Sequence, residues 1–375
     1  MPQTHGGTAI SRTDVINWVV ATVGICLRLS QAKTLGVFVG GALRVGRVSL
    51  PAIAEAAQGT SLLKHKIKRL WRFTDNWRVE VSDAMRGVVR KLLKKRNKRL
   101  VVSFDWTEFR KFHTLALVAV IKGRAVPLLW ASYPEWELYK SQNNLEEGLL
   151  RLFRDMVPPE VKVVILADRG FGRTELARVC QELGFRYVIR ITPQAWIRTA
   201  DFRGRLSRYP VKKGICVLLR NVEYRKNNPV VHHLVIRWKR DLPKHRDECW
   251  YLMTDLEGEP GWLSDLYGRR MSIEEVFRDQ KNQRNGFALR NTRIKQADRF
   301  DRLLLVLALA YLLLVGLGLH ARANYHPGHW CSATRRSECS VFTIGRRMLR
   351  KLKLSPAQAV AIVRAALCSG QENWG

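Results

Sequence analysis

The chain has 375 residues, of which 46% are apolar and 26% charged, so we expect a globular protein with a sizeable core and exclude a disordered chain. Lysine and arginine number 65 against 32 acidic residues, which gives a formal net charge of +33. This excess is spread along the whole chain, so it indicates a polyanion such as nucleic acid and disfavours a membrane surface, for which cations gather beside an anchor.

The N-terminal region, residues 1–95, is predicted to be helical and basic. A short apolar-patterned segment at 50–57 is followed by a turn at 58–60 and by a basic amphipathic segment at 61–73. This order is typical of a helix-turn-helix with a basic second helix, which we expect to contact DNA. The alternative is a solvated amphipathic helix that covers a core. The cations of the second helix are Lys64, Lys66, Lys68, Arg69 and Arg72.

The next part of the chain is predicted to form an α/β sheet. Strands are expected at 101–106, 112–121, 125–132, 161–167 and 185–191, with helices at 145–156 and 174–183. Gly184 is expected to cap the second helix. Three antiparallel strands followed by alternating helices and strands resemble the ribonuclease-H-like mixed sheet.

Later segments change character. Short β-patterned runs separated by basic turns occupy about 195–255, and helical patterns return at 263–281 and 340–366. The run Leu303–Leu319 is apolar throughout, but it lies at the short limit for a membrane span and charged or polar residues flank it. We therefore expect a buried core helix and no membrane partner.

These patterns divide the chain into five parts. They are a helical DNA-binding region (1–95), the first part of the ribonuclease-H-like core (96–194), a β-rich insertion (195–258), the final core helices (259–322) and a C-terminal helical region suited to dimerisation (323–375).

Three carboxylates carry the functional prediction. Asp105 and Asp168 each follow an apolar β-patterned run, and Glu274 lies in the helical pattern Tyr267-x2-Arg270-x3-Glu274-x6-Lys281. At about 100° per residue, these four helix positions fall within about 60° of one another, on one face. Such a face, opposite two further acids, suits a site that holds metal ions against a phosphodiester.

Each acid also has a simpler explanation. Taken alone, Asp105 and Asp168 would be turn residues. Glu275 is about 100° from Glu274 on the helix, so we expect it to face elsewhere as a solvated or ion-paired acid, and Glu108 is expected at the surface. The three acids together with the helix pattern favour the catalytic interpretation.

The helix pattern and the segments Phe104-Asp105-Trp106-Thr107 and Asp168-Arg169-Gly170-Phe171 resemble the DDE transposases of bacterial insertion sequences, in the class with the Y-R-E-K signature. The resemblance covers roughly residues 45 to 320. It implies cut-and-paste transposition by a synaptic homodimer acting on double-stranded DNA, at transposon ends and target. It also implies catalysis by Asp105, Asp168 and Glu274, with two Mg²⁺ ions (or Mn²⁺) at these acids and phosphate contacts from Tyr267, Arg270 and Lys281.

Some relatives of this class form hairpin ends, for which an insertion-domain tryptophan stacks on a flipped base. Trp250 lies where that residue would fall, and Trp238 is the second candidate. The alternative for Trp250 is a packing role in a strand. Two other functions stay open on this fold: a transposase-derived DNA-binding protein without catalysis, and a structure-specific nuclease.

The seven cysteines form no CxxC pair, which is typical of reduced thiols in the cytoplasm. The first residues follow no signal-peptide pattern. We expect a cytoplasmic protein that associates with the bacterial nucleoid through DNA. A zinc site within the cluster around His320, His326, His329, Cys331 and Cys339 is the less favoured alternative, because the spacing follows no standard pattern.

Overall fold

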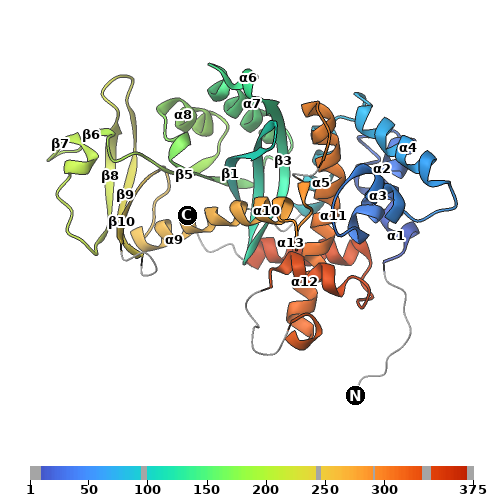
Figure 1. The fold of residues 1–375 in the computed structure, drawn as a ribbon. Helices are drawn as coiled ribbons and strands as arrows, with labels where there is room; N and C mark the ends of the chain where they lie inside the picture. Colours follow the sequence, from blue (N-terminus) through green and yellow to red (C-terminus); the bar gives the residue numbers. More distant parts are fainter. Residues whose placement is uncertain (1–9, 94–98, 242–245, 290–291, 332–338, 370–375) are drawn as a thin grey trace.

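The computed structural model describes residues 10–93, 99–241, 246–289, 292–331 and 339–369. A long sheet fills one side of the molecule and a helical body the other (Figure 1). The helices are α1 (Arg12–Val23), α2 (Leu29–Arg44), α3 (Leu50–Ala56), α4 (Leu63–Asp75), α5 (Val81–Leu92), α6 (Glu135–Leu138), α7 (Gln142–Arg154), α8 (Thr174–Glu182), α9 (Pro260–Gly268), α10 (Ser272–Lys281), α11 (Ala297–Asn324), α12 (Val341–Met348) and α13 (Pro356–Ser369). The strands are β1 (Arg99–Phe109), β2 (Phe112–Ile121), β3 (Arg124–Pro134), β4 (Lys162–Ala167), β5 (Arg186–Arg190), β6 (Trp196–Arg198), β7 (Arg203–Arg205), β8 (Cys216–Tyr224), β9 (Val230–Asp241) and β10 (Arg246–Thr254).

The sheet begins with the ribonuclease-H-like order. Its strands lie in the order β3-β2-β1-β4-β5-β10-β9-β8-β6-β7. Strands β1, β2 and β3 pair antiparallel, whereas β4 and β5 add in parallel to β1. The turn before β3 contains Gly123, and Gly184 follows α8; both adopt a positive φ that a residue with a Cβ avoids. The predicted core strands and their order are confirmed.

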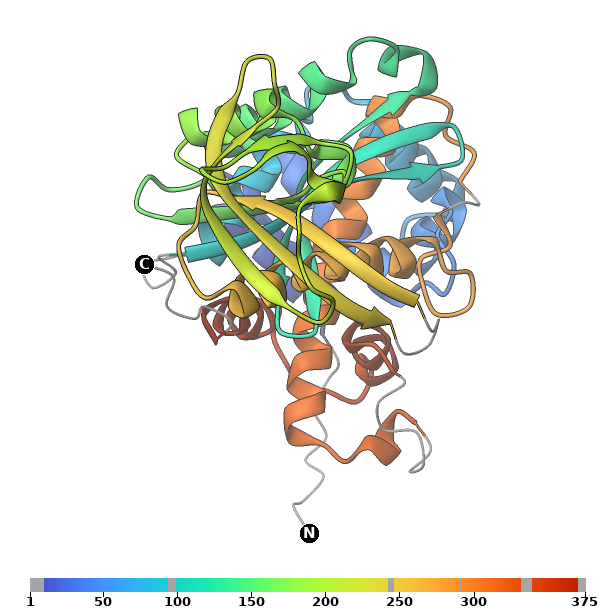
Figure 2. The ribbon, with the colours of Figure 1, turned by 90° about the vertical axis from the view of Figure 1, so that its left-hand side faces the viewer.

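The β-rich segment predicted as an insertion continues the same sheet. Strand β10 pairs antiparallel with β5, and β9, β8, β6 and β7 follow outward. Figure 2 shows β8, β9 and β10, in yellow, crossing in front of the teal core strands, because a sheet of this width twists. The segment therefore extends the core sheet beyond β5, the last strand of the core.

Helix α11 is the centre of the helical body. It packs against α2, α4, α5, α12, α13 and strand β3. It is long and apolar enough to cross a membrane, but 89% of its apolar window is buried inside the protein, as expected for a core helix. Helix α12 crosses α11 at close range, which Gly318 allows because it has no Cβ. A Cβ at this position would overlap the backbone of Val341. The N-terminal and C-terminal helices are thereby packed around one core helix.

The predicted helices at 263–281 and 340–366 are each interrupted. The first consists of α9, a 3-10 turn at Arg269–Met271, and α10. The second consists of α12 and α13, separated at 349–355, where Pro356 begins the new helix. The α9–α10 segment runs across one face of the sheet, from β8 and β9 to β3, as Figure 1 shows. This crossing places the signature residues over the sheet.

Candidate active site

Asp105 and Asp168 lie side by side where two parallel strands stop pairing. The ladder between β1 and β4 ends at Phe104 and Ala167, so the next residue of each chain segment is one of these acids. The strand expected at 101–106 is longer than predicted, because β2 continues to pair with β1 as far as Phe109. The acid lies inside β1, at the point where its parallel neighbour ends.

Both carboxylates face the α9–α10 segment. Side chains alternate along a strand, and Val101 and Leu166, which share the parity of the two acids, belong to an apolar cluster with Leu263 and Tyr267 of α9. The acids thus continue this face of the sheet beyond its apolar part. Asp168 also accepts a hydrogen bond from the amide of Gly170 (2.8 Å), which fixes the start of the following turn.

Arg270 joins the strand to the helix. Its guanidinium donates to Oδ2 of Asp105 (3.0 Å) and to Oε1 of Glu274 (2.7 Å). The Arg270 side chain is buried, whereas that of Glu274 is 42% exposed. A planar guanidinium with two bonded partners holds its position firmly. Arg270 therefore bridges the carboxylates of Asp105 and Glu274 and holds them close together.

The protonation of Asp105 reflects this setting. Burial raises the pKa of Asp105 to about 6. The charge of Arg270 opposes that rise, and the charges of Asp168 and Glu274 add to it. Asp105 is therefore close enough to each of the other two predicted acids for their charges to act on it. Carboxylates held close together attract a cation more strongly than a single carboxylate does.

Tyr267 faces the same site. Burial raises the pKa of its hydroxyl, which Arg270 and Arg190 lower and Asp168 raises. The Tyr267 ring meets the edge of the Trp250 ring, with centroids 5.2 Å apart. Trp250, which is partly buried, thus lies beside α9, the helix that carries Tyr267. Trp238 lies on the neighbouring strand β9, with the Lys213 ammonium 5.8 Å from its ring.

Lys281 lies further along than the other signature residues. Its ammonium lies over the Phe109 ring (5.2 Å) and the Phe277 ring (5.9 Å). Phe109 is the last residue of β1, four residues after Asp105. Glu274 and Lys281 both lie in α10, seven residues apart, so Lys281 stays on nearly the same face but about 10 Å further along the helix axis. Tyr267, Arg270 and Glu274 are gathered around the acids, and Lys281 extends the row toward the β1–β2 turn.

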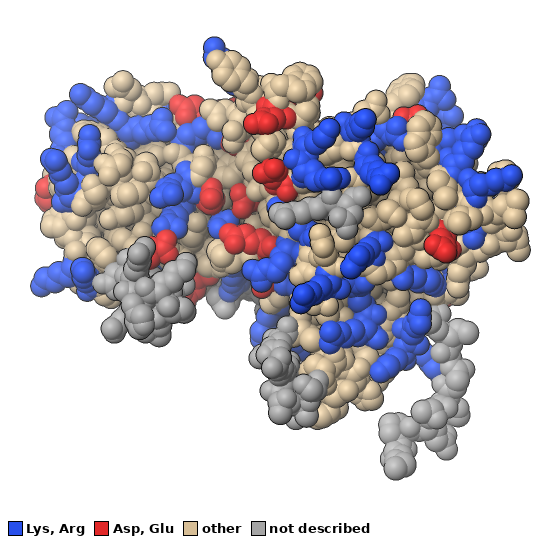
Figure 3. All heavy atoms as spheres, viewed as in Figure 1, with Lys and Arg blue, Asp and Glu red and all other residues tan. Residues whose placement is uncertain are grey.

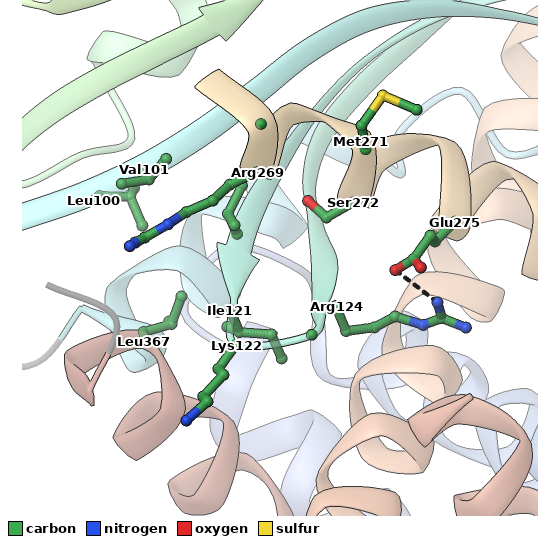
Figure 4. A pocket seen from close by; sticks show the side chains of 13 residues that line it. Leu100, Val101, Ile121, Lys122, Arg124, Arg269, Met271, Ser272, Glu275 and Leu367 are labelled. Carbon is green, nitrogen blue, oxygen red and sulfur yellow. Dashed lines mark ion pairs between the residues drawn. The ribbon is translucent and has the colours of Figure 1, made fainter. Parts of the chain in front are cut away.

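The opposite flank of α10 is held by ion pairs to the buried Arg124. Glu275 pairs with Arg124 (2.8 Å), as Figure 4 shows, and Arg124 also pairs with Asp279 (2.8 Å). The Tyr311 hydroxyl of α11 donates to Asp279 (2.9 Å). A cavity of about 420 Å³ lies between this flank and the β2–β3 turn. Glu275 therefore faces away from the acids, as the sequence predicts.

Three charged residues at or beside the site were not predicted: Arg190, Glu146 and Arg173. Arg190 ends β5, directly beyond the residue that pairs with Ala167, and it bonds to Glu248 of β10 (2.6 Å). A buried pair between Glu146 of α7 and Arg173 supports the turn after Asp168, and Trp106 donates to Glu146 (2.8 Å). The only signal for Arg190 was a cation at the end of an apolar run; the sequence gave no sign that Glu146 and Arg173 would meet.

The predicted cations of α4 fall into two groups. Lys64, Lys68 and Arg72 are exposed. Lys66 donates to the carbonyl of Ala57 at the end of α3 (2.7 Å), and Arg69 donates to Thr34 of α2 (2.7 Å). The short α3, the turn and α4 thus form as the sequence predicts. Part of the basic face is used to attach the helix to its neighbours.

Metal binding depends on how many donor side chains lie close together. Among the described residues, no three Asp, Glu, His or Cys side chains stand close enough together to hold a metal ion as they are placed. This includes the described part of the candidate zinc cluster. At the three acids, Arg270 lies between two of the carboxylates. The donor type nevertheless fits a hard divalent cation, which prefers carboxylate oxygens.

The chain matches a known protein family over the whole of this site. A family model described as the transposase DDE domain matches residues 96–313. The match covers more than half of the chain, from the approach to β1 into α11, and includes all three acids. No curated protein sequence matches the chain.

Proposed function

Because this chain belongs to the transposase DDE domain family, it is a transposase of an insertion sequence, and we propose that it cleaves and joins DNA at Asp105, Asp168 and Glu274. The observation that supports this assignment is the adjacency of Asp105 and Asp168 beyond the β1–β4 ladder, beneath the helix that carries Glu274. We propose a cut-and-paste reaction on the inverted-repeat ends of the element, followed by strand transfer into target DNA.

DDE transposases use divalent metal ions, and we propose two Mg²⁺ ions here, with Mn²⁺ as a substitute. Asp105, Asp168 and Glu274 would hold these ions. When bound, such ions supply activation of a water or 3′-hydroxyl and stabilisation of the leaving oxygen. The raised pKa of Asp105, about 6, still leaves this carboxylate ionised near pH 7.5, ready to act as a ligand.

The cations near the acids are proposed to hold the DNA. Arg270 is placed to exchange one carboxylate for a phosphate oxygen, because its planar fork suits both groups equally. Tyr267, Arg190 and Lys281 continue the row on either side. Phosphate contacts of this kind fix the register of the duplex without reading its sequence.

Trp250 is proposed to receive a flipped base during hairpin formation. Support comes from its contact with Tyr267, which places an indole ring within one aromatic contact of the signature helix. The same contact is also what a packing role predicts, so the two roles need a direct test. A homodimer in the synaptic complex and action at the nucleoid in the cytoplasm complete the proposal.

The triad is tested by neutral substitutions of nearly equal volume. Asp105→Asn, Asp168→Asn and Glu274→Gln should each reduce Mg²⁺-dependent nicking to background, with binding to the end largely kept, because each loses a metal ligand. The substrate is a duplex that ends in the inverted repeat flanking the gene. Glu108→Gln is the matched control, since Glu108 is exposed and lies three positions after Asp105 on β1, on the opposite face of the strand.

Three outcomes separate the candidate functions. Near wild-type nicking by any triad variant would remove that residue from the site. A wild-type protein that binds the end but never nicks it would indicate a DNA-binding protein without catalysis. Nicking without joining of the cut end to a target would indicate a nuclease.

A further inference from the structure

A groove lies where the N-terminal helices meet the segment before α11. Its cavity has a volume of about 710 Å³. One wall is the start of α3 with Leu50 and Pro51, and Trp71 of α4 lies across from the segment 292–296 and the first turn of α11. The groove is therefore built by two parts of the chain more than 200 residues apart in sequence. None of its residues belongs to the site described above.

The groove is basic. Its lining includes Arg293, Lys295 and Arg299 and no acidic residue. Arg293 and Lys295 are exposed, as are Lys68 and Arg72 on the neighbouring helix α4. In Figure 3, Lys and Arg side chains gather along this face from the middle of the molecule to α4. Charge of one sign lining a concave surface attracts a polyanion.

The groove also exposes an aromatic ring. Trp71 is 47% exposed, although most large apolar side chains of the protein are buried. The Arg299 guanidinium lies over the ring, 4.4 Å from its centroid, and Arg299 pairs with Asp75 (3.5 Å). This stack fixes the plane of the indole. An oriented, partly exposed ring between cations offers an apolar surface to a sugar or a base.

A direct hydrogen bond connects the groove to the strand of the active site. Arg110 follows β1 and donates to the carbonyl of Thr292, which lines the groove (3.1 Å). Asp105 and Arg110 are five residues apart, which corresponds to roughly 17 Å along a strand. The same length corresponds to about five base pairs of a duplex. A duplex that held its scissile phosphate at Asp105 and ran along β1 would reach the groove within its first turn.

We propose that this groove binds the sugar–phosphate backbone of the element's duplex DNA, about five or more base pairs from the cleaved phosphodiester. Arg293 and Lys295 neutralise phosphates, and Trp71, held by Arg299, packs against the deoxyribose between them. The proposal rests on the proposed function, because it takes Asp105 as the cleavage point. It assigns the junction between α4 and the catalytic part a role in fixing the duplex relative to the acids.

The two kinds of contact predict different salt dependence. The probe is a fluorescein-labelled duplex that ends in the inverted repeat flanking the gene, titrated at several salt concentrations. Arg293→Gln/Lys295→Gln should lower the slope of log affinity against log salt by about 1–2, since each phosphate contributes about 0.9. Trp71→Ala should weaken binding several-fold with the slope unchanged, and Trp71→Phe should restore most of the affinity.

A variant of equal net charge is the control. Arg151→Gln/Lys162→Gln removes two exposed cations on α7 and at the start of β4, away from the groove, and should leave the slope within error of wild type. Thermal melts of all variants exclude misfolding as the cause, and phosphate-ethylation interference should place the Arg293 and Lys295 contacts at the stated distance.

The outcomes distinguish this proposal from the proposed function. An unchanged slope in the double variant, or a slope reduced equally in the control, overturns the groove. So does wild-type affinity of Trp71→Ala at every salt concentration. Failure of the wild-type protein to bind or nick the duplex contradicts the proposed function instead. Loss of affinity in the groove variants with normal nicking by wild type supports both.

Discussion

Helices α10 and α4 are both short, polar and rich in charge, but the fold treats their charges differently. On α10, Glu274 bonds to Arg270, and Glu275 and Asp279 both pair with Arg124. On α4, Lys64, Lys68 and Arg72 project into solvent. The acids of α10 are thus held by ion pairs, whereas these three cations of α4 are exposed.

The difference corresponds to what each helix is proposed to do. Metal-assisted cleavage requires carboxylates in set positions, because misplacement by about 1 Å costs large factors in rate. Neutralising a phosphate only requires a cation nearby, and mobile side chains serve as well as fixed ones. Single substitutions around α10 should therefore have large effects, and single substitutions on α4 small ones.

Arg124→Gln should have the largest effect outside the three acids. The substitution leaves Asp279 and Glu275 without their cation, and breaking a buried pair costs about 3–5 kcal/mol. With the back of α10 loosened, cleavage should fall by about 10- to 100-fold, while end binding changes little. Nicking rates and end affinities of wild type, Arg124→Gln and Arg124→Lys measure this, with Lys expected to recover part of the rate.

The loss should depend on pH. Burial raises the pKa of Asp279 to about 6, against opposition from Arg124 and Tyr311. With a folded pKa above the unfolded one, the folded state binds the extra proton, and this contribution to stability is lost as pH rises through about 6. Without Arg124 the pKa rises further. Urea unfolding should therefore show a small cost of Arg124→Gln at about pH 5 and a larger one at about pH 8.

A cost that does not vary with pH would show that Asp279 is not the group stranded by the substitution. Arg151→Gln is the matched control, because Arg151 forms an exposed pair with Glu182 (3.1 Å). Exposed pairs contribute about 0–1 kcal/mol, so this variant should keep its stability and activity at both pH values.

The same contrast between local and distant determinants explains what the sequence could predict. The core strands, the exposed face of α4 and the shared face of Tyr267, Arg270 and Glu274 follow from local periodicity. The pairing of β10 with β5 depends on contacts between segments about 60 residues apart, which no local pattern encodes. Lys281 keeps the face of Glu274 on α10, but it lies seven residues further along the helix, a displacement that an angular pattern does not express.

Buried polar partners were the other gap. Arg173 and Glu146 come from different elements, and neither is distinguished in the sequence from a surface charge. Arg124 falls between the strands expected at 112–121 and 125–132, and nothing in the sequence marks it as the buried side chain that fixes α10. Such residues become visible only when the fold shows which charges lose their solvent.

Trp250→Ala should have an intermediate effect that divides its two proposed roles. If the ring receives a flipped base, a stacking platform of roughly 1–3 kcal/mol is lost, so nicked ends accumulate and hairpins form slowly. If the ring only packs on Tyr267, the melting temperature falls and every step slows together. Gel analysis of nicked, hairpin and resolved ends, beside a thermal melt, measures both.

Trp238→Ala provides the comparison, since Trp238 lies on the adjacent strand and stacks with Lys213 rather than with the signature helix. It should leave the ratio of nicked to hairpin ends close to wild type. An unchanged melt together with a normal ratio in Trp250→Ala would exclude both the base-flipping role and the packing role.

The smallest effects are expected on α4, where the structure separates cations that look alike in sequence. Lys64→Gln and Lys68→Gln should each lower the salt slope of duplex binding by up to about 0.9 with no change in stability, because these side chains are exposed. Lys66→Gln should do the reverse. It loses the hydrogen bond to the carbonyl of Ala57, at a cost of about 1 kcal/mol, and should keep the slope. Salt titrations and thermal melts of the three variants measure this. If Lys66→Gln lowers the slope as much as Lys68→Gln does, Lys66 gives up its bond to Ala57 to contact DNA, and the division between bonded and exposed cations does not hold within α4.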